Sequence, residues 1–306
     1  MVSLYIVMKI VNIIGGLGNQ MFQYAFAISL KHMHPDEDIY VDTTHFNYIL
    51  IKKFKGANLH NGFEIKSVFP NADVAQAGFF QLIKITWYIP NYFFSRIVRK
   101  ILPLRKHEYI QDYQNLYVSE KQMMSINEDC YYEGYWQCVD NFKESRDEII
   151  KQFEHGIPNA ENENIIKKMQ EVNSVGIHIR RGDYLHEPAY MHICDLDYYK
   201  RAIALILEKK ADYTFYIFSN DMEWCKENIL PLLKCNSVVQ MNSNKGANSC
   251  WDMILMSYCK DLIIANSSFS WWGAFLNKRN GRIVTPKKWV NDIDNCNIWL
   301  DNWIKV

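Results

Sequence analysis

The second half of the chain alternates short apolar runs with amphipathic segments, and this rhythm constrains the fold more than any other feature. The predicted strands are Ser174–Ile179, Thr214–Ser219, Ser237–Gln240 and Asp261–Ala265, and the helices that follow them are Asp197–Lys209, Met222–Leu233, Asn248–Cys259 and Ser270–Asn277. Strands that are joined through helices run parallel, and the helices cover the sheet. Residues 156–306 are therefore predicted to form a doubly wound β/α domain.

The N-terminal part opens with a unit of the same kind. An apolar strand at Lys9–Ile14 runs into a glycine-rich turn, and a helix at Asn19–His32 and a strand at Ile39–Asp42 follow. The polar, turn-rich residues 156–164 are predicted to form a surface linker. The expected architecture is thus α/β, with one Rossmann-like β/α domain over residues 1–155, a second over 156–306, and a cleft between them.

Composition excludes several classes of function. Lys and Arg together number 34, as do Asp and Glu, so the net charge is zero and a nucleic-acid partner is not expected. The eight cysteines form no Cys-x-x-Cys pair and are sparse in 306 residues, which excludes a zinc finger and a disulfide scaffold. The apolar start of the chain is interrupted at Gly15-Gly16, so neither a signal peptide nor a membrane span is expected. We expect a reduced, cytoplasmic protein.

One segment points to a different surface. Residues 87–107 mix aromatic side chains with basic ones, namely Arg96, Arg99, Lys100, Arg105, Lys106 and His107. A basic face on a solvated helix explains this composition, and peripheral contact with the inner face of a membrane is the alternative.

The glycine-rich turn Gly15-Gly16-Leu17-Gly18-Asn19-Gln20 lies between a predicted strand and a predicted helix. Backbone N–H groups at such a helix start bind anions, although a tight turn alone also requires glycine. A dinucleotide-binding motif would use Gly16 and Gly18, with an acidic residue near Asp42, but would need a glycine where Met21 stands. A nicotinamide-dependent dehydrogenase that uses the Gly15–Gly18 turn is therefore an alternative function.

A cluster of charged residues directly follows the first predicted strand of the second domain: His178-Ile179-Arg180-Arg181-Gly182-Asp183-Tyr184. Doubly wound sheets bind ligands beyond the carboxyl ends of their strands. Arginine carries a permanent charge on a planar fork that suits phosphate. In an extended strand His178 and Arg180 share one face, and Arg181 lies on the other. A salt-bridged strand end, with Asp183 holding either arginine, is the structural alternative.

Residues Asn266–Gly273 follow the last predicted strand and enter a helix. Hydroxyl and N–H groups at this point would receive a diphosphate, although serines are also common helix N-caps. The Trp271-Trp272 pair is predicted to pack in the core. The Asp-x-Asp tripeptides at 36–38, 195–197 and 292–294 do not end apolar strands, so no metal site is expected, and Asp195 is predicted to cap a helix.

Four segments together resemble the motifs of the bacterial α-1,2-fucosyltransferases of glycosyltransferase family 11. They are GGLGNQMFQYA at 15–25, HIRRGDY at 178–184, FSNDMEWC at 218–225 and NSSFSWWGAFL at 266–276. The resemblance implies a GT-B-like fold, with the acceptor on the N-terminal domain and GDP-L-fucose on the C-terminal domain. It also implies transfer with inversion to the 2-hydroxyl of a terminal galactose, without a metal or other cofactor. In the wider fucosyltransferase group the first arginine of the His-x-Arg motif contacts the donor diphosphate, which corresponds to Arg180 here.

Site roles follow from the motifs and the chemistry. We predict catalytic roles for Arg180, which would carry leaving-group charge together with Ser267–Ser270, for Asp183 as general base, and for Asn19, which would orient the acceptor or the leaving phosphate. The predicted donor-binding residues are Gly16, Gly18, His178, Arg180, Ser219, Asn220, Asp221, Asp252, Ser267, Ser268 and Phe269. Of these, Asn220, Asp221 and Asp252 would meet ribose or guanine, because a carboxylate accepts from the guanine N1 and N2 hydrogens. A non-enzymatic sugar-binding protein is a further alternative.

Overall fold

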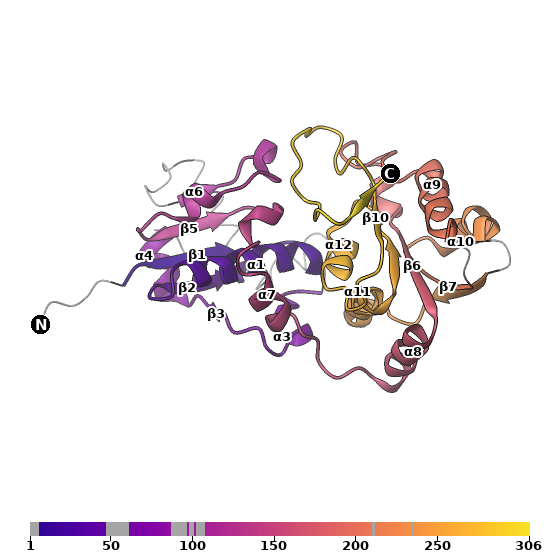
Figure 1. The fold of residues 1–306 in the computed structure, drawn as a ribbon. Coiled ribbons are helices and arrows are strands. Elements are labelled where there is room, and N and C mark those ends of the chain that lie inside the picture. Colours follow the sequence, from indigo (N-terminus) through magenta and orange to yellow (C-terminus); the bar gives the residue numbers. More distant parts are fainter. Residues whose placement is uncertain are drawn as a thin grey trace, which may run out of the picture. The chain divides into compact units, whose positions relative to one another are not determined.

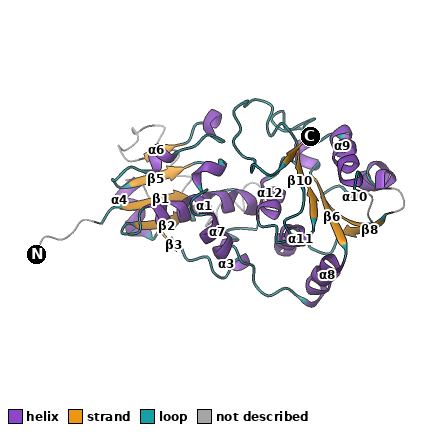
Figure 2. Cartoon of the chain, viewed as in Figure 1, coloured by secondary structure: helices purple, strands orange, loops and turns teal. Residues whose placement is uncertain are grey.

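The chain divides into two compact units. In the computed structural model, which describes residues 6–46, 61–86, 97, 101, 108–209, 212–233 and 236–306, the first unit is Met1–His155 with Asn295–Ile298. The second unit is Gly156–Asp294 with Trp299–Val306. Each unit contains a β-sheet with helices packed against it (Figures 1 and 2).

Among the described residues, the sheet of the first unit has five strands in the order β3-β2-β1-β5-β4, and all of the pairings are parallel. The strands are β1 (Met8–Asn12), β2 (Asp38–Asp42), β3 (Ala75–Gln76), β4 (Glu108–Ile110) and β5 (Cys130–Glu133). The helices described in this unit are α1 (Leu17–Met33), α3 (Ile65–Val68), α4 (Phe79–Thr86), α6 (Lys121–Met124) and α7 (Arg146–Gln152).

Helices α1 and α4 cover opposite faces of this sheet, as two adjacent residues of β5 show. The ring of Tyr132 lies 5.5 Å from that of Phe26 in α1. Tyr131 packs instead with Leu82 and Ile85 of α4. Consecutive strand residues point to opposite faces, so the core of this unit has two layers.

The sheet of the second unit has six strands in the order β11-β10-β9-β6-β7-β8, again all parallel. The strands are β6 (Asn173–Ile179), β7 (Tyr213–Ser219), β8 (Ser237–Met241), β9 (Asp261–Ile263), β10 (Ile283–Thr285) and β11 (Ile304–Lys305). The helices are α8 (Ala160–Glu171), α9 (Leu196–Leu207), α10 (Met222–Asn228), α11 (Cys250–Tyr258) and α12 (Ser268–Phe275). The predicted alternation of strand and helix is confirmed.

Both sheets contain a point where the strand order changes direction. In the second unit β7 and β8 lie on one side of β6, whereas β9, β10 and β11 lie on the other. In the first unit β2 and β3 lie on one side of β1, and β5 lies on the other. Open α/β sheets bind ligands beyond the carboxyl ends of the strands that flank such a point. Candidate sites are therefore expected after β6 and β9, and after β1 and β5.

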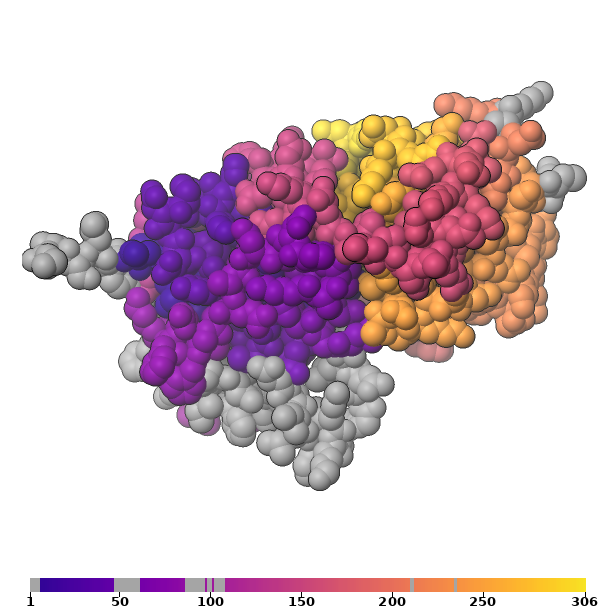
Figure 3. Space-filling view, turned by 90° about the horizontal axis from the view of Figure 1, so that it is seen from below, coloured from indigo at the N-terminus to yellow at the C-terminus, as the bar shows by residue number. Residues whose placement is uncertain are grey.

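The predicted linker at 156–164 is wrong from residue 160 onward, because helix α8 begins there. Asn159 caps the helix, since its side-chain oxygen accepts a hydrogen bond from the backbone N–H of Asn162 at 2.8 Å. Glu161 and Glu163 lie in the first turn, where the helix dipole favours negative charge. Helix α8 packs beside α11, and Figure 3 shows residues of the two segments as neighbouring surfaces.

The sequence predicted that every residue after 155 belongs to the second domain, and this is wrong for one short segment. Residues 295–298 belong to the first unit. The backbone N–H of Val139 donates to the carbonyl of Asn297 at 2.9 Å, and the N–H of Asn297 donates to the carbonyl of Tyr117 at 3.1 Å. Because Ile298 is also fully buried, this short segment is built into the first unit by both its backbone and its side chain.

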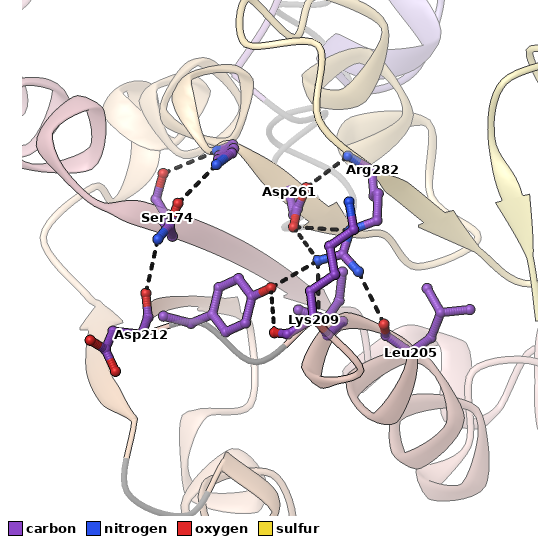
Figure 4. Close-up of polar contacts among 10 residues, drawn as sticks. Ser174, Leu205, Lys209, Asp212, Asp261 and Arg282 are labelled. Atoms are coloured by element: carbon purple, nitrogen blue, oxygen red, sulfur yellow. Dashed lines mark hydrogen bonds and ion pairs between the residues drawn. The ribbon is translucent and has the colours of Figure 1, made fainter.

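A buried ion pair joins the starts of β9 and β10 to the end of α9. The guanidinium of Arg282 contacts Asp261 Oδ2 through Nη2 at 2.7 Å and through Nε at 3.2 Å. It also donates to the carbonyls of Leu205 at 3.1 Å and Ile206 at 3.2 Å (Figure 4). Only 18% of the Arg282 side chain and 7% of the Asp261 side chain are exposed. This network lies at the amino ends of the strands, the opposite edge from the predicted ligand site.

Several simpler expectations can be compared with the described residues. Except for Ile97 and Ile101, the segment 87–107 lies outside them. Within the described ranges, no helix has the length and apolar character needed to cross a membrane. None of the seven described cysteines forms a disulfide bond.

Candidate functional site

The chain leaves β6 through a tight turn that begins at Gly182. Its φ is +53°, a backbone conformation that favours glycine, and a Cβ there would lie 2.8 Å from Nδ2 of Asn220. Residues 182–185 form a single 3₁₀ turn. Arg180 and Arg181 therefore stand at the carboxyl edge of the sheet, beside the point where the strand order changes.

Within the described part of the chain, Arg180 contacts two side chains of this turn. Its Nη2 lies 2.9 Å from Oδ2 of Asp183, and its guanidinium carbon lies 5.5 Å from the centroid of the Tyr184 ring. The Arg180 side chain is 38% exposed and that of Asp183 is 60% exposed. The guanidinium is therefore both restrained and accessible to a ligand.

Arg181 points to the other side of the strand, toward α10. Its backbone N–H donates to Oδ1 of Asn220 at 2.9 Å, and its Nε donates to Oδ2 of Asp221 at 3.0 Å. The guanidinium carbon also lies 4.2 Å from the Trp224 ring centroid. Asp221 in turn caps α10, because its Oδ1 accepts from the backbone N–H of Trp224. Asn220 and Asp221, which were predicted to meet the nucleoside, thus fasten the end of β6 to the end of β7.

His178 lies on the opposite face, toward α12. It is 7% exposed, and its ring centroid lies 5.9 Å from that of Phe269. Burial, reinforced by the Arg180 guanidinium, lowers the pKa of His178 to about 3, so the imidazole is neutral. Its Nδ1 has no hydrogen-bond partner among the described residues. This ring is a neutral polar group beside Arg180 and not a second cation.

The start of α12 supplies fewer free hydroxyls than expected. Ser267 precedes the helix and is 6% exposed, and its hydroxyl neighbours the Tyr184 phenol, whose pKa burial raises and this hydroxyl lowers. Ser268 and Phe269 are partly exposed. Ser270 is fully buried, and its hydroxyl donates to the backbone carbonyls of Ala265 and Ser267. Ser270 is thus not free to contact a ligand. Trp271 and Trp272 are fully buried, as predicted.

Asp252 lies in the first turn of α11, beyond β8. Its Oδ1 accepts a hydrogen bond from Asn244 at 2.8 Å, and the Asn244 side chain pairs with that of Asn162 in α8. Burial raises the pKa of Asp252 to about 6. No partner is found for Oδ2 among the described residues, so this oxygen can accept from a ligand. Asp252 is the predicted nucleoside-binding residue whose side chain keeps acceptor capacity.

In the first unit, the switch point brings the glycine-rich turn against the end of β5. Gly15 has a φ of +81°, and Gly16 precedes α1. Oδ1 of Asn19 accepts from Nε2 of Gln137 at 2.9 Å, and Nδ2 of Asn19 lies near Gly15. Asn19 is therefore fixed with its N–H donors toward the turn. Gln137 is a site residue that the sequence did not indicate, because it lies 118 positions away from Asn19.

Asp42 does not fit the dehydrogenase alternative. It is 4% exposed, its Oδ2 accepts from the Tyr131 hydroxyl at 2.7 Å, and its Oδ1 accepts from the backbone N–H of Thr44 at 2.8 Å. The carboxylate is therefore nearly buried and held by contacts within the protein, so it is not presented to a ribose hydroxyl.

Two solved structures share this architecture. The fucosyltransferase NodZ from Bradyrhizobium aligns with a TM-score of 0.50 at 13% identity, over 94% of this chain and 98% of NodZ. NodZ α-1,6-fucosyltransferase soaked with GDP-fucose aligns with a TM-score of 0.51 at 12% identity, over 92% and 96%. The two parallel sheets and these likenesses define a protein of the GT-B fold class.

Sequence comparison narrows the class to one family. The family model described as glycosyl transferase family 11 matches residues 8–306, and the chain belongs to this family of glycosyltransferases. It is 29% identical to the O-antigen biosynthesis glycosyltransferase WbnK of Escherichia coli, over 95% of this chain and 98% of WbnK. It is 30% identical to an α-1,2-colitosyltransferase of the same organism, over 95% and 96%. Galactoside α-(1,2)-fucosyltransferase 2 of Rattus norvegicus is 24% identical, over 87% of this chain and 66% of the rat protein.

Proposed function

We propose that this glycosyltransferase moves L-fucose from GDP-β-L-fucose to the 2-hydroxyl of a terminal galactose, with inversion at the fucose anomeric carbon. The names of two similar proteins support an α-1,2 linkage. A GDP-fucose soak of a protein with the same fold supports the donor. The acceptor is proposed to be an oligosaccharide or a surface polysaccharide, bound on the side of Asn19.

The observation that carries this proposal is the arrangement of cationic and polar groups where the strand order changes. Arg180, after β6, and Ser267, before α12, flank that point, and the Tyr184 side chain packs on Arg180 and neighbours Ser267. An accessible guanidinium beside a helix start matches the charge and shape of a diphosphate. As the bond between the fucose C1 and the phosphate oxygen breaks, its electron pair leaves with GDP, and these groups would stabilise the charge that develops there.

Bond formation occurs on the opposite side of the fucose ring. The galactose 2-hydroxyl oxygen bonds to C1, and its proton passes to a base, for which we propose Asp183. The transition state of glycosyl transfer has oxocarbenium character, so a weak base suffices. We further propose that no metal takes part. Among the described residues, no group of three or more His, Cys, Asp or Glu side chains is placed to hold one.

Asp183→Asn is expected to lower kcat by about 10–100-fold while GDP affinity stays within about twofold. Loss of the base slows proton transfer, but the oxocarbenium character of the transition state limits the cost. Steady-state kinetics and calorimetric titration with GDP measure the two effects. Because Asp183 also pairs with Arg180, the substitution could act through the guanidinium, and the measurements distinguish this from loss of a base. Loss of GDP binding with a normal kcat at saturation would show that Asp183 only holds the guanidinium.

For the nucleoside we propose that Asp252 accepts the N1 and N2 hydrogens of guanine. A carboxylate can accept both, whereas the protonated acid presents an O–H to one of these donors. Because the pKa of Asp252 is raised to about 6, the carboxylate is present above that pH and is lost as the pH falls through it.

GDP affinity is therefore expected to fall several-fold between pH 7.5 and pH 5 in the wild-type protein. The terminal phosphate of GDP also titrates near pH 6 and contributes to this fall. Asp252→Asn shares the phosphate effect, so it is the matched control. It should bind GDP more weakly at pH 7.5 and lose less affinity on acidification. If both proteins lost the same factor in GDP affinity on acidification, Asp252 would not be the residue that binds guanine.

Nucleotide-activated colitose is a second candidate donor, because one of the similar proteins is an α-1,2-colitosyltransferase. Colitose is L-fucose without its 3-hydroxyl, so the same diphosphate and guanine contacts would serve either donor. Discrimination would then depend on side chains around the sugar.

A donor and acceptor panel tests the proposal. GDP-fucose and GDP-colitose are incubated with galactosides in EDTA, and the new linkage is located by NMR. Fucosylation at the galactose 2-position, undiminished by EDTA, is the expected result. Transfer from GDP-colitose alone would show that GDP-colitose, and not GDP-fucose, is the donor. Turnover that EDTA abolishes and Mg²⁺ or Mn²⁺ restores would overturn the metal-free mechanism.

A further inference from the structure

Tyr184 links two parts of the candidate donor site that come from different strands. Its ring centroid lies 5.5 Å from the guanidinium carbon of Arg180, and its phenol neighbours the hydroxyl of Ser267, which opposes the rise in phenol pKa that burial causes. Arg180 follows β6, and Ser267 stands between β9 and α12. One side chain therefore lies next to residues from both sides of the point where the strand order changes.

The Tyr184 ring is itself held in place. It stacks on Tyr190, with the ring centroids 4.7 Å apart and the ring planes 21° apart. Stacked aromatic rings attract one another and restrict each other's rotation. Tyr184 itself lies in the 3₁₀ turn Gly182–Leu185, which follows β6. The ring is thus a fixed surface on which the guanidinium can rest.

The other partner of Arg180 cannot fix the guanidinium to the same degree. Asp183 lies three residues further on in the same turn, and its side chain is 60% exposed. Exposed ion pairs are screened by water and restrain two mobile side chains only weakly. A ring beneath the guanidinium restrains its orientation, which matters because a fork of parallel N–H donors recognises phosphate only in the right plane.

From these contacts we propose that Tyr184 is a positioning residue, which orients the Arg180 guanidinium relative to the start of α12 for diphosphate binding. This inference rests on the proposed function of the site. Tyr184 acts through Arg180 and Ser267 and has no covalent part in the reaction.

Truncation of the ring tests the role. Tyr184→Leu is expected to lower kcat/KM for GDP-fucose by about tenfold, the scale of a partly buried cation–π contact. Most of this loss should appear in kcat, because the guanidinium is needed most as the leaving group gains charge. Tyr184→Phe keeps the ring and loses only the hydroxyl that neighbours Ser267, so it should retain activity within about threefold of the wild type.

A double-mutant cycle separates positioning from general packing. In an Arg180→Ala background, Tyr184→Leu should change kcat/KM by less than twofold, because its effect passes through the missing guanidinium. The matched control is Tyr258→Leu, which removes another tyrosine that faces a cation, Lys278 at 4.9 Å, and should leave kcat/KM unchanged. Thermal unfolding checks that each variant is folded, and Tyr184→Met replaces Tyr184→Leu if the latter is not.

The outcomes distinguish this inference from the function on which it rests. If Tyr184→Leu costs the same factor with and without Arg180, or matches the wild type, the positioning role is wrong while the donor assignment stands. If the wild-type protein binds no GDP in calorimetric titration, both the donor assignment and the role of Tyr184 are wrong.

Discussion

Arg180→Ala should depress kcat/KM for GDP-fucose by on the order of 10²–10³, the scale seen when one pre-aimed donor to a developing negative charge is removed. Arg180 ends the strand beside the switch point, and its guanidinium is accessible. A charge-assisted contact that strengthens as the diphosphate departs favours the transition state over the ground state, so kcat should fall along with kcat/KM.

Two further variants sharpen this test. Arg180→Lys should recover only part of the loss, because a point charge cannot reproduce two parallel N–H donors. Arg181→Ala should affect stability more than chemistry, since Arg181 pairs with Asp221 and packs on Trp224. Steady-state kinetics on folded variants decide the matter. An Arg180→Ala protein that turns over GDP-fucose within a few-fold of the wild type would remove this residue from the donor site.

Arg282→Met should lower the free energy of unfolding of the second unit by about 3–5 kcal/mol, because it leaves the nearly buried Asp261 carboxylate without its cation. The carbonyls of Leu205 and Ile206 lose donors at the same time. For a unit of this size, a loss on that scale corresponds to a decrease in Tm of roughly 6–20 °C. Differential scanning calorimetry resolves the transition.

The matched control is a solvent-exposed pair in the same unit. Lys200 and Asp197 lie 2.9 Å apart, and both side chains are at least half exposed. Lys200→Met should therefore cost less than about 1 kcal/mol. The double variant Arg282→Met with Asp261→Leu should recover part of the lost stability, since no unpaired charge remains. An Arg282→Met protein as stable as Lys200→Met would contradict a stabilising role for the network.

The parts of the fold that the sequence predicted are those in which local pattern and tertiary packing agree. The strand at Ser174–Ile179 is apolar throughout its centre and became β6. Two boundaries shifted for local reasons that the residues carry. The helix predicted over Met222–Leu233 ends at Asn228, three residues before Pro231, and the helix predicted from Asn248 begins as a 3₁₀ turn. Strands β10 and β11, of three and two residues, were not predicted.

The candidate site was less predictable, because its contacts join residues that are distant in sequence. Periodicity placed Arg180 and Arg181 at a strand end. It did not show that the Arg181 guanidinium pairs with Asp221, which lies 40 residues further on. Nor did periodicity show that the Ser270 hydroxyl is taken up by the backbone carbonyl of Ala265 and so differs from that of Ser267. Tyr184 stood within the recognised motif, yet only the packing around Arg180 and Ser267 indicates what it does.

The short stretch 295–298 limits how this enzyme can be recombined with its relatives. Its residues complete the first unit, while those just before and after it belong to the second. A chimera joined at residue 155 would take Asn297 and Ile298 from the wrong parent and set them against a foreign Tyr117 and Val139. The segment to exchange for the proposed acceptor side is therefore discontinuous and consists of residues 1–155 together with 295–298. Exchanges intended to change acceptor preference should carry both pieces.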